Sequence, residues 1–157
     1  MSLLTPFSKW AGIVVLEINS KSKNIVAQFE KFNDWEDKYA EIIKLGKNLP
    51  EMPKEFMVDG NKVKGCQSQV WLYPDMNAGL DSLKFYATSD ALIAKGLIAL
   101  VLEVYNGSSA KEIMTTPPEF INEIGLQNHL SPNRSNGLQA MVKQIKIYAY
   151  ALTMKNS

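Results

Sequence analysis

The sequence predicts an α+β fold in which several helices pack against a small antiparallel sheet of about three strands. Before residue 50 and after residue 130, apolar residues recur at the helical spacings of three and four. Residues 58–88 instead combine β-favouring runs with turn residues. Residues 91–107 are apolar on almost every face, as expected for a buried central helix. Helices gathered on one side of antiparallel strands define the α+β class.

The first helical segment covers residues 24–32, and residues 33–49 follow as a second helix. Asn33 and Glu36 stand three residues apart, which is the spacing of a capping box at a helix start. Pro50 and Pro53 follow the second segment, and proline cannot continue a helix. The pattern therefore predicts two consecutive helices ahead of the sheet.

The predicted strands lie within residues 58–63, 69–73 and 80–88. Asp59 and Gly60 form a tight-turn dipeptide between short apolar positions. Residues 69–73 are rich in β-favouring side chains, and residues 74–79 contain the proline and glycine of a turn. We expect these segments to form a small antiparallel sheet of two or three strands.

Four helices are predicted after the sheet. Asp90 precedes the apolar helix in the position of an N-cap. Short helices follow within residues 108–115 and 117–125. Ser131 and Pro132 have the identities of an N-cap and a first helical residue, and they open the last helix.

Composition limits the classes of function. The chain has 157 residues, of which 46% are apolar and 21% charged, and a net charge of +1. These values are ordinary for one globular domain, and they give no bulk attraction to nucleic acid or to an anionic membrane. We assign residues 24–157 to the domain and residues 1–23 to an N-terminal extension of uncertain structure. The apolar run at 11–18 is a poor signal peptide, because it contains Glu17 and no small-residue cleavage site follows.

One cysteine and one histidine exclude several kinds of site. A single cysteine cannot form an internal disulfide, and the pair cannot build a structural zinc site. The sequence also lacks a phosphate loop and the glycine triplet of a dinucleotide site. No run approaches the ~20 apolar residues of a membrane helix. A lone unpaired thiol is typical of proteins of the reducing cytoplasm, so we expect this protein to be cytoplasmic.

That cysteine, Cys66, lies in the segment VKGCQSQVW at the start of a predicted strand. Most free cysteines are small buried hydrophobes. Here, however, Gln67, Ser68 and Gln69 follow it, and burying three polar side chains would require a partner for each. Gly65 allows either a turn or the close approach of another protein's backbone. These neighbours indicate that the thiol lies on a loop accessible to a partner and is not packed in the core.

Strand alternation adds that Cys66 could share a face with Val70 and Leu72. If the alternation extends back that far, the sulfur tucks toward the apolar side. We therefore expect a thiol that is sheltered at rest and exposed when a partner docks.

Two chemistries remain open for this thiol. A cysteine hydrolase or transferase would need His129 as its base. His129 precedes the last helix, where packing or a backbone contact is the simpler role. A sulfur carrier needs neither base nor oxyanion hole, since thiolate attack on a persulfide requires exposure and a fraction of thiolate. With an unperturbed pKa near ~8.5, a few per cent of the thiol is ionised at neutral pH.

Three longer segments resemble one known family. GCQSQVWL, SDALIAKGLIALVLEVYNG and LQNHLSPNRSNGLQAM are similar to SufE and its relative CsdE, sulfur-acceptor proteins of iron–sulfur cluster assembly. NDWEDKYAEIIKLGKNLP is similar to that family's N-terminal helix. The resemblance covers roughly residues 24–153 in order, and it leaves residues 1–23 outside.

The resemblance implies helices packed on a small antiparallel sheet. It implies that Cys66 accepts sulfur from the persulfide of a SufS- or CsdA-like cysteine desulfurase and passes it to a SufBCD-like scaffold. The pyridoxal phosphate would belong to the desulfurase, so this chain would need no cofactor and would have no turnover of its own. The resemblance leaves monomer and homodimer both open.

The resemblance also suggests supporting residues around the thiol. Gly65, Gln67, Ser68 and Gln69 frame Cys66 and would touch the partner, although local loop geometry explains them equally well. Arg134 would steady a persulfide anion or pair with the partner, and a structural ion pair is the alternative. Asp90 matches a position near the partner surface, and a plain N-cap is the alternative.

Overall fold

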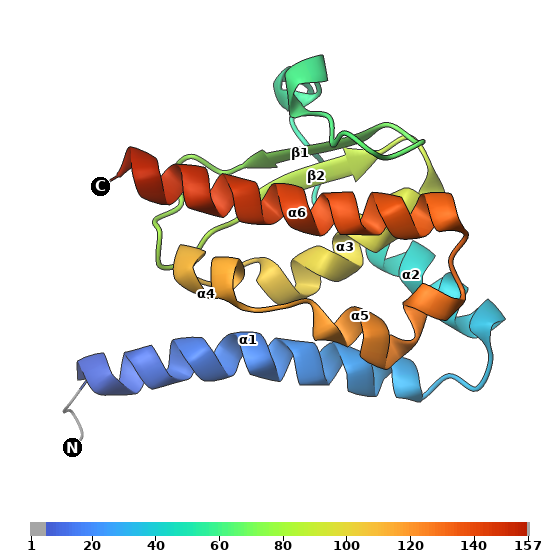
Figure 1. Ribbon diagram of the computed structural model, residues 1–157, viewed down its shortest axis with the longest axis horizontal. Helices are drawn as coiled ribbons and strands as arrows, with labels where there is room; N and C mark the ends of the chain where they lie inside the picture. Colours follow the sequence, from blue (N-terminus) through green and yellow to red (C-terminus); the bar gives the residue numbers. More distant parts are fainter. Residues whose placement is uncertain (1–5, 157) are drawn as a thin grey trace.

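The structure, a computed structural model, describes the backbone of residues 6–156 and the side chains of residues 18–156. Its helices and strands follow one another as shown in Figure 1. They are α1 (Pro6–Glu30), α2 (Trp35–Lys47), β1 (Val70–Pro74), β2 (Phe85–Ser89), α3 (Leu92–Tyr105), α4 (Ala110–Thr115), α5 (Glu119–Ile124) and α6 (Pro132–Lys155), with short 3-10 turns at Lys54–Phe56, Asp59–Asn61 and Leu126–Asn128.

The sheet is antiparallel, as predicted, and contains two paired strands. Leu72 of β1 lies opposite Ala87 of β2. The third predicted strand is reduced to a single antiparallel bridge between Lys62 and Trp71. Most of the predicted segment, residues 59–61, instead forms a 3-10 turn before the bridge, and the chain turns again at residues 64–65. The α+β class is confirmed, with two strands and one bridge in place of about three strands.

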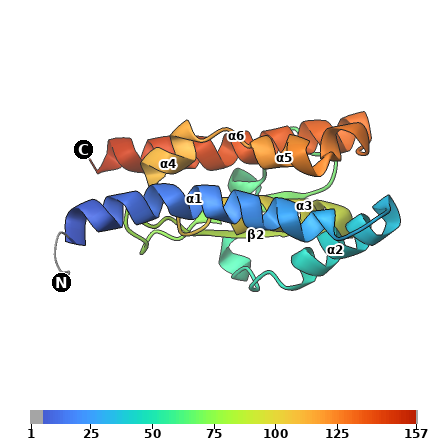
Figure 2. The ribbon, with the colours of Figure 1, turned by 90° about the horizontal axis from the view of Figure 1, so that it is seen from below.

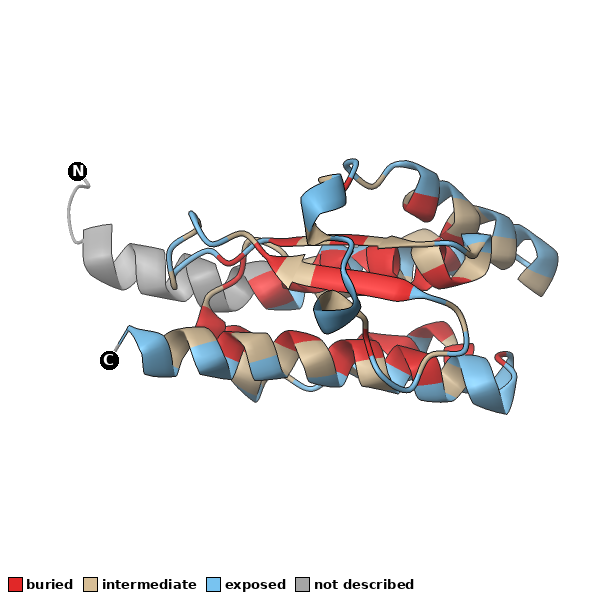
Figure 3. Cartoon of the chain, turned by 90° about the horizontal axis from the view of Figure 1, so that it is seen from above, coloured by how far each residue is buried: buried red, intermediate tan, exposed pale blue. Residues whose placement is uncertain are grey.

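Helix α3 is the centre of the molecule, as its apolar sequence predicts. It packs against α1, α2, α6 and β2. Ten of its residues are buried, and Tyr105 is among the largest buried side chains. Figures 1 and 2 show α6 on one side of α3 and α1 running past its other side. The buried residues of β1, β2 and α6 face the same interior (Figure 3).

The helix ends confirm some capping predictions and correct others. Ser131 caps α6 by accepting the backbone N–H of Arg134 at 3.3 Å. Helix α2 is capped by Asp34 rather than Asn33, and Asp34 Oδ1 accepts the N–H of Asp37 at 2.9 Å. The N-cap interpretation of Asp90 is wrong, because the N-cap position of α3 is Ala91 and its side chain makes no cap bond.

The boundary drawn between residues 23 and 24 falls inside α1, which runs unbroken from Pro6 to Glu30. Ile18 is buried in the same core as Ile25 and Phe29. The helical backbone therefore includes most of the predicted extension. The side chains of residues 1–17, and all of residues 1–5, lie outside the described residues.

Candidate functional site

Cys66 lies in a six-residue loop, residues 64–69, which we call the Cys66 loop. The backbone N–H of Val63 donates to Val70 O at 2.8 Å and closes the base of this loop. Gly65 has a φ of 99°, in the left-handed region that side chains disfavour. A Cβ on Gly65 would also lie 3.3 Å from Ala140 Cβ of α6. The glycine is therefore required by the turn and by the close approach of α6.

The thiol is half-buried against α6. Cys66 Sγ donates to the carbonyl oxygen of Gly137 at 3.6 Å. Gly137 has no side chain, and a Cβ there would contact Sγ at 3.4 Å. Because β1 begins at Val70, strand alternation does not reach Cys66. The thiol is therefore sheltered, as expected, but by helix α6 and not by the face of a strand.

A groove of about 800 Å³ opens beside the thiol, between α2, α3, α6 and the Cys66 loop. Leu92, at the start of α3, is 61% exposed on its wall. We call this the thiol groove. Its lining residues are Tyr39, Ile43, Cys66, Gln67, Ser68, Ala91, Leu92, Ile93, Ala94, Leu97, Ser131, Asn133, Arg134, Gly137 and Met141.

The structure brings some of the predicted site residues together and separates others. Gln67, Ser68 and Arg134 line the thiol groove with Cys66. Gly65 forms the turn behind the thiol, outside the groove lining. Gln69 and Asp90 lie at the end of the Cys66 loop, where they bond to each other.

Gly137 and Leu92 are site residues that the sequence reasoning missed. Gly137 stands inside α6, where glycine costs roughly 1 kcal/mol relative to alanine. A glycine in a helix interior therefore signals a close approach, and that signal was available in the sequence. Leu92 gave no comparable signal, because an apolar residue opening an apolar helix looks like part of the core.

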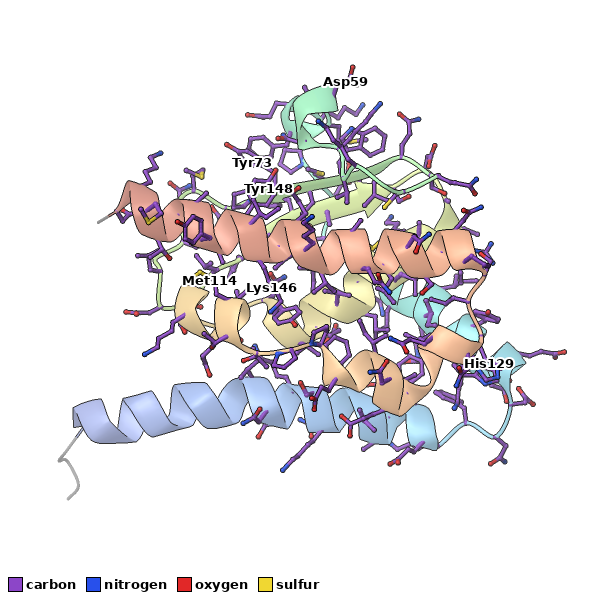
Figure 4. All side chains as sticks on the ribbon, in the orientation of Figure 1. Asp59, Tyr73, Met114, His129, Lys146 and Tyr148 are labelled. Atoms are coloured by element: carbon purple, nitrogen blue, oxygen red, sulfur yellow. The ribbon has the colours of Figure 1, made fainter. Side chains whose placement is uncertain are left out.

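The predicted alternative base, His129, is engaged elsewhere. Its ring stacks on Trp35 with a centroid distance of 3.9 Å, and its Nδ1 lies 3.1 Å from Gly125 O. Figure 4 shows His129 at the end of the molecule beside the start of α2. His129 is not part of the thiol groove lining. The geometry therefore offers no Cys66–His129 dyad.

Other kinds of site find no support in the part of the chain that the structure describes. There, no three or more histidine, cysteine or acidic side chains gather closely enough to hold a metal ion. Residues 6–156 likewise contain no helix that is long and apolar enough to cross a membrane.

Burial raises the pKa of the Cys66 thiol, because the thiolate loses hydration in the half-apolar site. The sequence led us to expect an unperturbed pKa for Cys66, and the structure shows that this expectation is too low. At neutral pH the sheltered thiol carries less thiolate than a free cysteine, and thiolate is the reactive form.

We expect alkylation of Cys66 by iodoacetamide to rise with pH, with a midpoint above that of the same protein unfolded in urea. The rate constants of both samples, measured across pH 6–11, test this expectation. Coinciding pH profiles would contradict the sheltered geometry.

The fold and the site define a small α+β protein that carries its one thiol on a loop, sheltered by a helix and opening onto an apolar groove. Comparisons with known proteins assign its family. The family model for SufE, described as "Fe-S metabolism associated domain", matches residues 23–149. The chain belongs to the SufE family.

Individual relatives agree with this assignment. An "Uncharacterized SufE-like protein" of Rhizobium meliloti (strain 1021) is 43% identical over 125 residues, which cover 78% of this chain and 89% of that protein. The "Cysteine desulfuration protein SufE" of Wigglesworthia glossinidia brevipalpis is 35% identical over 136 residues, covering 86% of this chain and 94% of that protein.

A solved structure shares the fold. The solution structure of a hypothetical protein from Thermus thermophilus has a TM-score of 0.71 and 20% identity, covering 85% of this chain and 96% of that one. The α+β architecture is thus a known arrangement.

Proposed function

We propose that Cys66 accepts a sulfane sulfur from the persulfide of a pyridoxal-phosphate-dependent cysteine desulfurase and passes it to an iron–sulfur scaffold. The observation that carries the proposal is the setting of the thiol: Cys66 lies on a loop with Gln67 and Ser68 and faces the thiol groove. The chain has no second cysteine, so an internal disulfide cannot displace the bound sulfur. The relative named as a cysteine desulfuration protein supports the same role.

The transfer needs no oxidant or reductant. Cys66 loses its proton to solvent, and the thiolate attacks the outer sulfur of the donor persulfide. A sulfur–sulfur bond forms at Cys66 while the donor's sulfur–sulfur bond breaks, and the donor leaves as a thiolate. The sulfane sulfur keeps its oxidation state throughout.

The raised pKa of Cys66 opposes this step while the thiol rests against Gly137. We infer that docking of the donor in the thiol groove displaces the thiol from α6 and restores thiolate where it is needed. In this proposal Arg134, which lines the thiol groove, attracts the anion that forms.

The cofactor belongs to the donor in this proposal. Pyridoxal phosphate stays in the desulfurase, and this chain holds only the transient persulfide. It therefore has no catalytic turnover of its own. We place the exchange in the cytoplasm, because a lone acceptor thiol requires a reducing compartment.

The test is a burst measurement without reductant. A cysteine desulfurase mixed with L-cysteine releases about one alanine per active site and then stalls on its own persulfide. Adding this protein should release about one further alanine per added Cys66. An alanine yield that does not change with added protein would overturn the proposal.

A further inference from the structure

A second groove, of about 690 Å³, lies on the other flank of α6 from the thiol groove. It runs between α6, α5 and residues 117–118, and it shares no lining residue with the thiol groove. We call it the proline groove, after Pro117 and Pro118. The apolar side chains that line it, four of them buried, are Ile121, Leu130, Leu138, Val142, Ile147 and Tyr150.

Two of these apolar side chains remain exposed on α6. Ile147 is 46% exposed and Tyr150 is 58% exposed. They stand three positions apart in the helix, so they lie on the same face. An exposed aliphatic and aromatic pair beside buried apolar side chains is typical of an interaction surface, where such residues act as anchors.

The shape of the proline groove favours a helix as its occupant. Its lining extends along α6 from Ser135 to Tyr150, which corresponds to about 22 Å of helix. A partner segment of about four helical turns has the same length. An amphipathic helix that lies in such a groove places its apolar side chains against the buried ones.

The main chain of the opposite wall gives the same answer. Pro117 and Pro118 have no N–H to offer. The carbonyl oxygens of Ile113 and Thr116 each accept a hydrogen bond from Lys146 Nζ at 2.8 Å (Figure 4). An extended peptide would need a row of main-chain groups to pair with, whereas a helix pairs its own.

The charges of the proline groove favour an acidic occupant. Helix α6 contains four basic residues and no aspartate or glutamate. Lys143 and Lys146 line the groove from α6, and Glu119 lines it from α5. Acidic side chains on the edge of the occupant next to α6 would therefore pair with the two lysines. A symmetric pair of this chain would instead bring the same basic groove against itself.

We propose that the proline groove binds an amphipathic, acidic helix of a partner protein. Ile147 and Tyr150 are its apolar anchors, and Lys143 is its exposed charged contact. Because the two grooves share no lining residue, this partner and the sulfur donor bind at different sites. The binding therefore does not depend on sulfur transfer.

The test uses two synthetic peptides and NMR spectroscopy. Each peptide is a stapled helix of about 16 residues, the length of the groove, with leucines along one face. Glutamates flank the leucines in one peptide, and lysines replace them in its twin. The acidic peptide should shift the amide signals of isotope-labelled protein at residues 119–122 and 138–150, and leave those of the Cys66 loop unchanged. The lysine twin should bind about tenfold more weakly.

Three variants identify the contacts. Tyr150→Ser should weaken binding of the acidic peptide about tenfold, the loss expected for an aromatic anchor. Met76→Ser is the matched control, because Met76 is 47% exposed but lies in the turn after β1, and it should bind as the unmodified protein does. Lys143→Glu should reverse the order of the two peptides. All three positions are exposed, so the urea midpoints should stay close together.

Several outcomes would overturn the proposal. They are the absence of saturable shifts with the acidic peptide, equal affinities for the two peptides, and shifts centred on the thiol groove. A dimer that Tyr150→Ser dissociates would assign the proline groove to contact between two copies of this chain. Binding to phosphatidylglycerol vesicles, with no binding of either peptide, would assign it to a membrane surface, and the proposal would be equally wrong.

Discussion

Cys66→Ser is expected to support none of the further alanine release that the unmodified protein adds to the desulfurase's own first turnover, while leaving the thiol groove intact. The hydroxyl of serine cannot form a sulfur–sulfur bond, so no acceptor remains in a chain with one cysteine. The change replaces one atom, and the serine hydroxyl can still donate to Gly137 O as the thiol does. The variant should therefore dock normally and compete with the unmodified protein.

The measurement is the alanine burst with unmodified protein and an increasing excess of Cys66→Ser. The rate of the burst should fall as the variant occupies the desulfurase. Alanine release with Cys66→Ser alone that exceeds the desulfurase's own first turnover would contradict the assignment of Cys66. His129→Ala is the matched control and should keep the full burst, whereas a Cys66–His129 hydrolase would lose its activity.

Gly96→Ala is expected to have the largest effect on stability. Gly96 of α3 lies where α2 crosses most closely, opposite Gly46. A Cβ on Gly96 would lie 2.7 Å from the carbonyl carbon of Ile42 and 2.6 Å from its Cγ2. The obstacle is helix backbone and cannot rotate away, so the two helices must separate. We expect a loss of about 3 kcal/mol or more in the free energy of unfolding, the upper range for overpacking a core.

Urea unfolding followed by circular dichroism measures this loss. Gly60→Ala is the matched control, because a Cβ on Gly60 meets no atom within 4 Å. It should change the unfolding free energy by less than about 0.5 kcal/mol. A Gly96→Ala protein with an unchanged urea midpoint would show that α2 and α3 do not cross at these glycines.

Local signals predicted most of the helices. Ser131 and Pro132 predicted the start of α6, because an N-cap hydroxyl and a first-turn proline act within a single turn. The apolar residues of α3 predicted its burial for the same reason, since helix periodicity is a property of neighbouring positions. The polar residues that follow Cys66 likewise predicted that it lies on a loop and not in the core.

Long-range contacts were outside the reach of the sequence. Asp90 has the identity and place of an N-cap, yet its carboxylate bonds to Gln69, 21 positions away. The shelter of Cys66 comes from Gly137, 71 positions away. The alternation of the strand predicted that the apolar face of the sheet would shelter the thiol. The pattern of one strand carries no information about α6, which shelters it in the structure. The third strand is reduced to one bridge because residues 59–61 form a 3-10 turn directly before it.

The intact mass of the protein tests the central claim most directly. After incubation with a cysteine desulfurase and L-cysteine without reductant, the protein should gain about 32 Da, one sulfur atom, and dithiothreitol should remove it. Cys66→Ser should keep its original mass under the same conditions. An unmodified protein that shows no gain, while the desulfurase carries its own persulfide, would contradict the role of Cys66 as the sulfur acceptor.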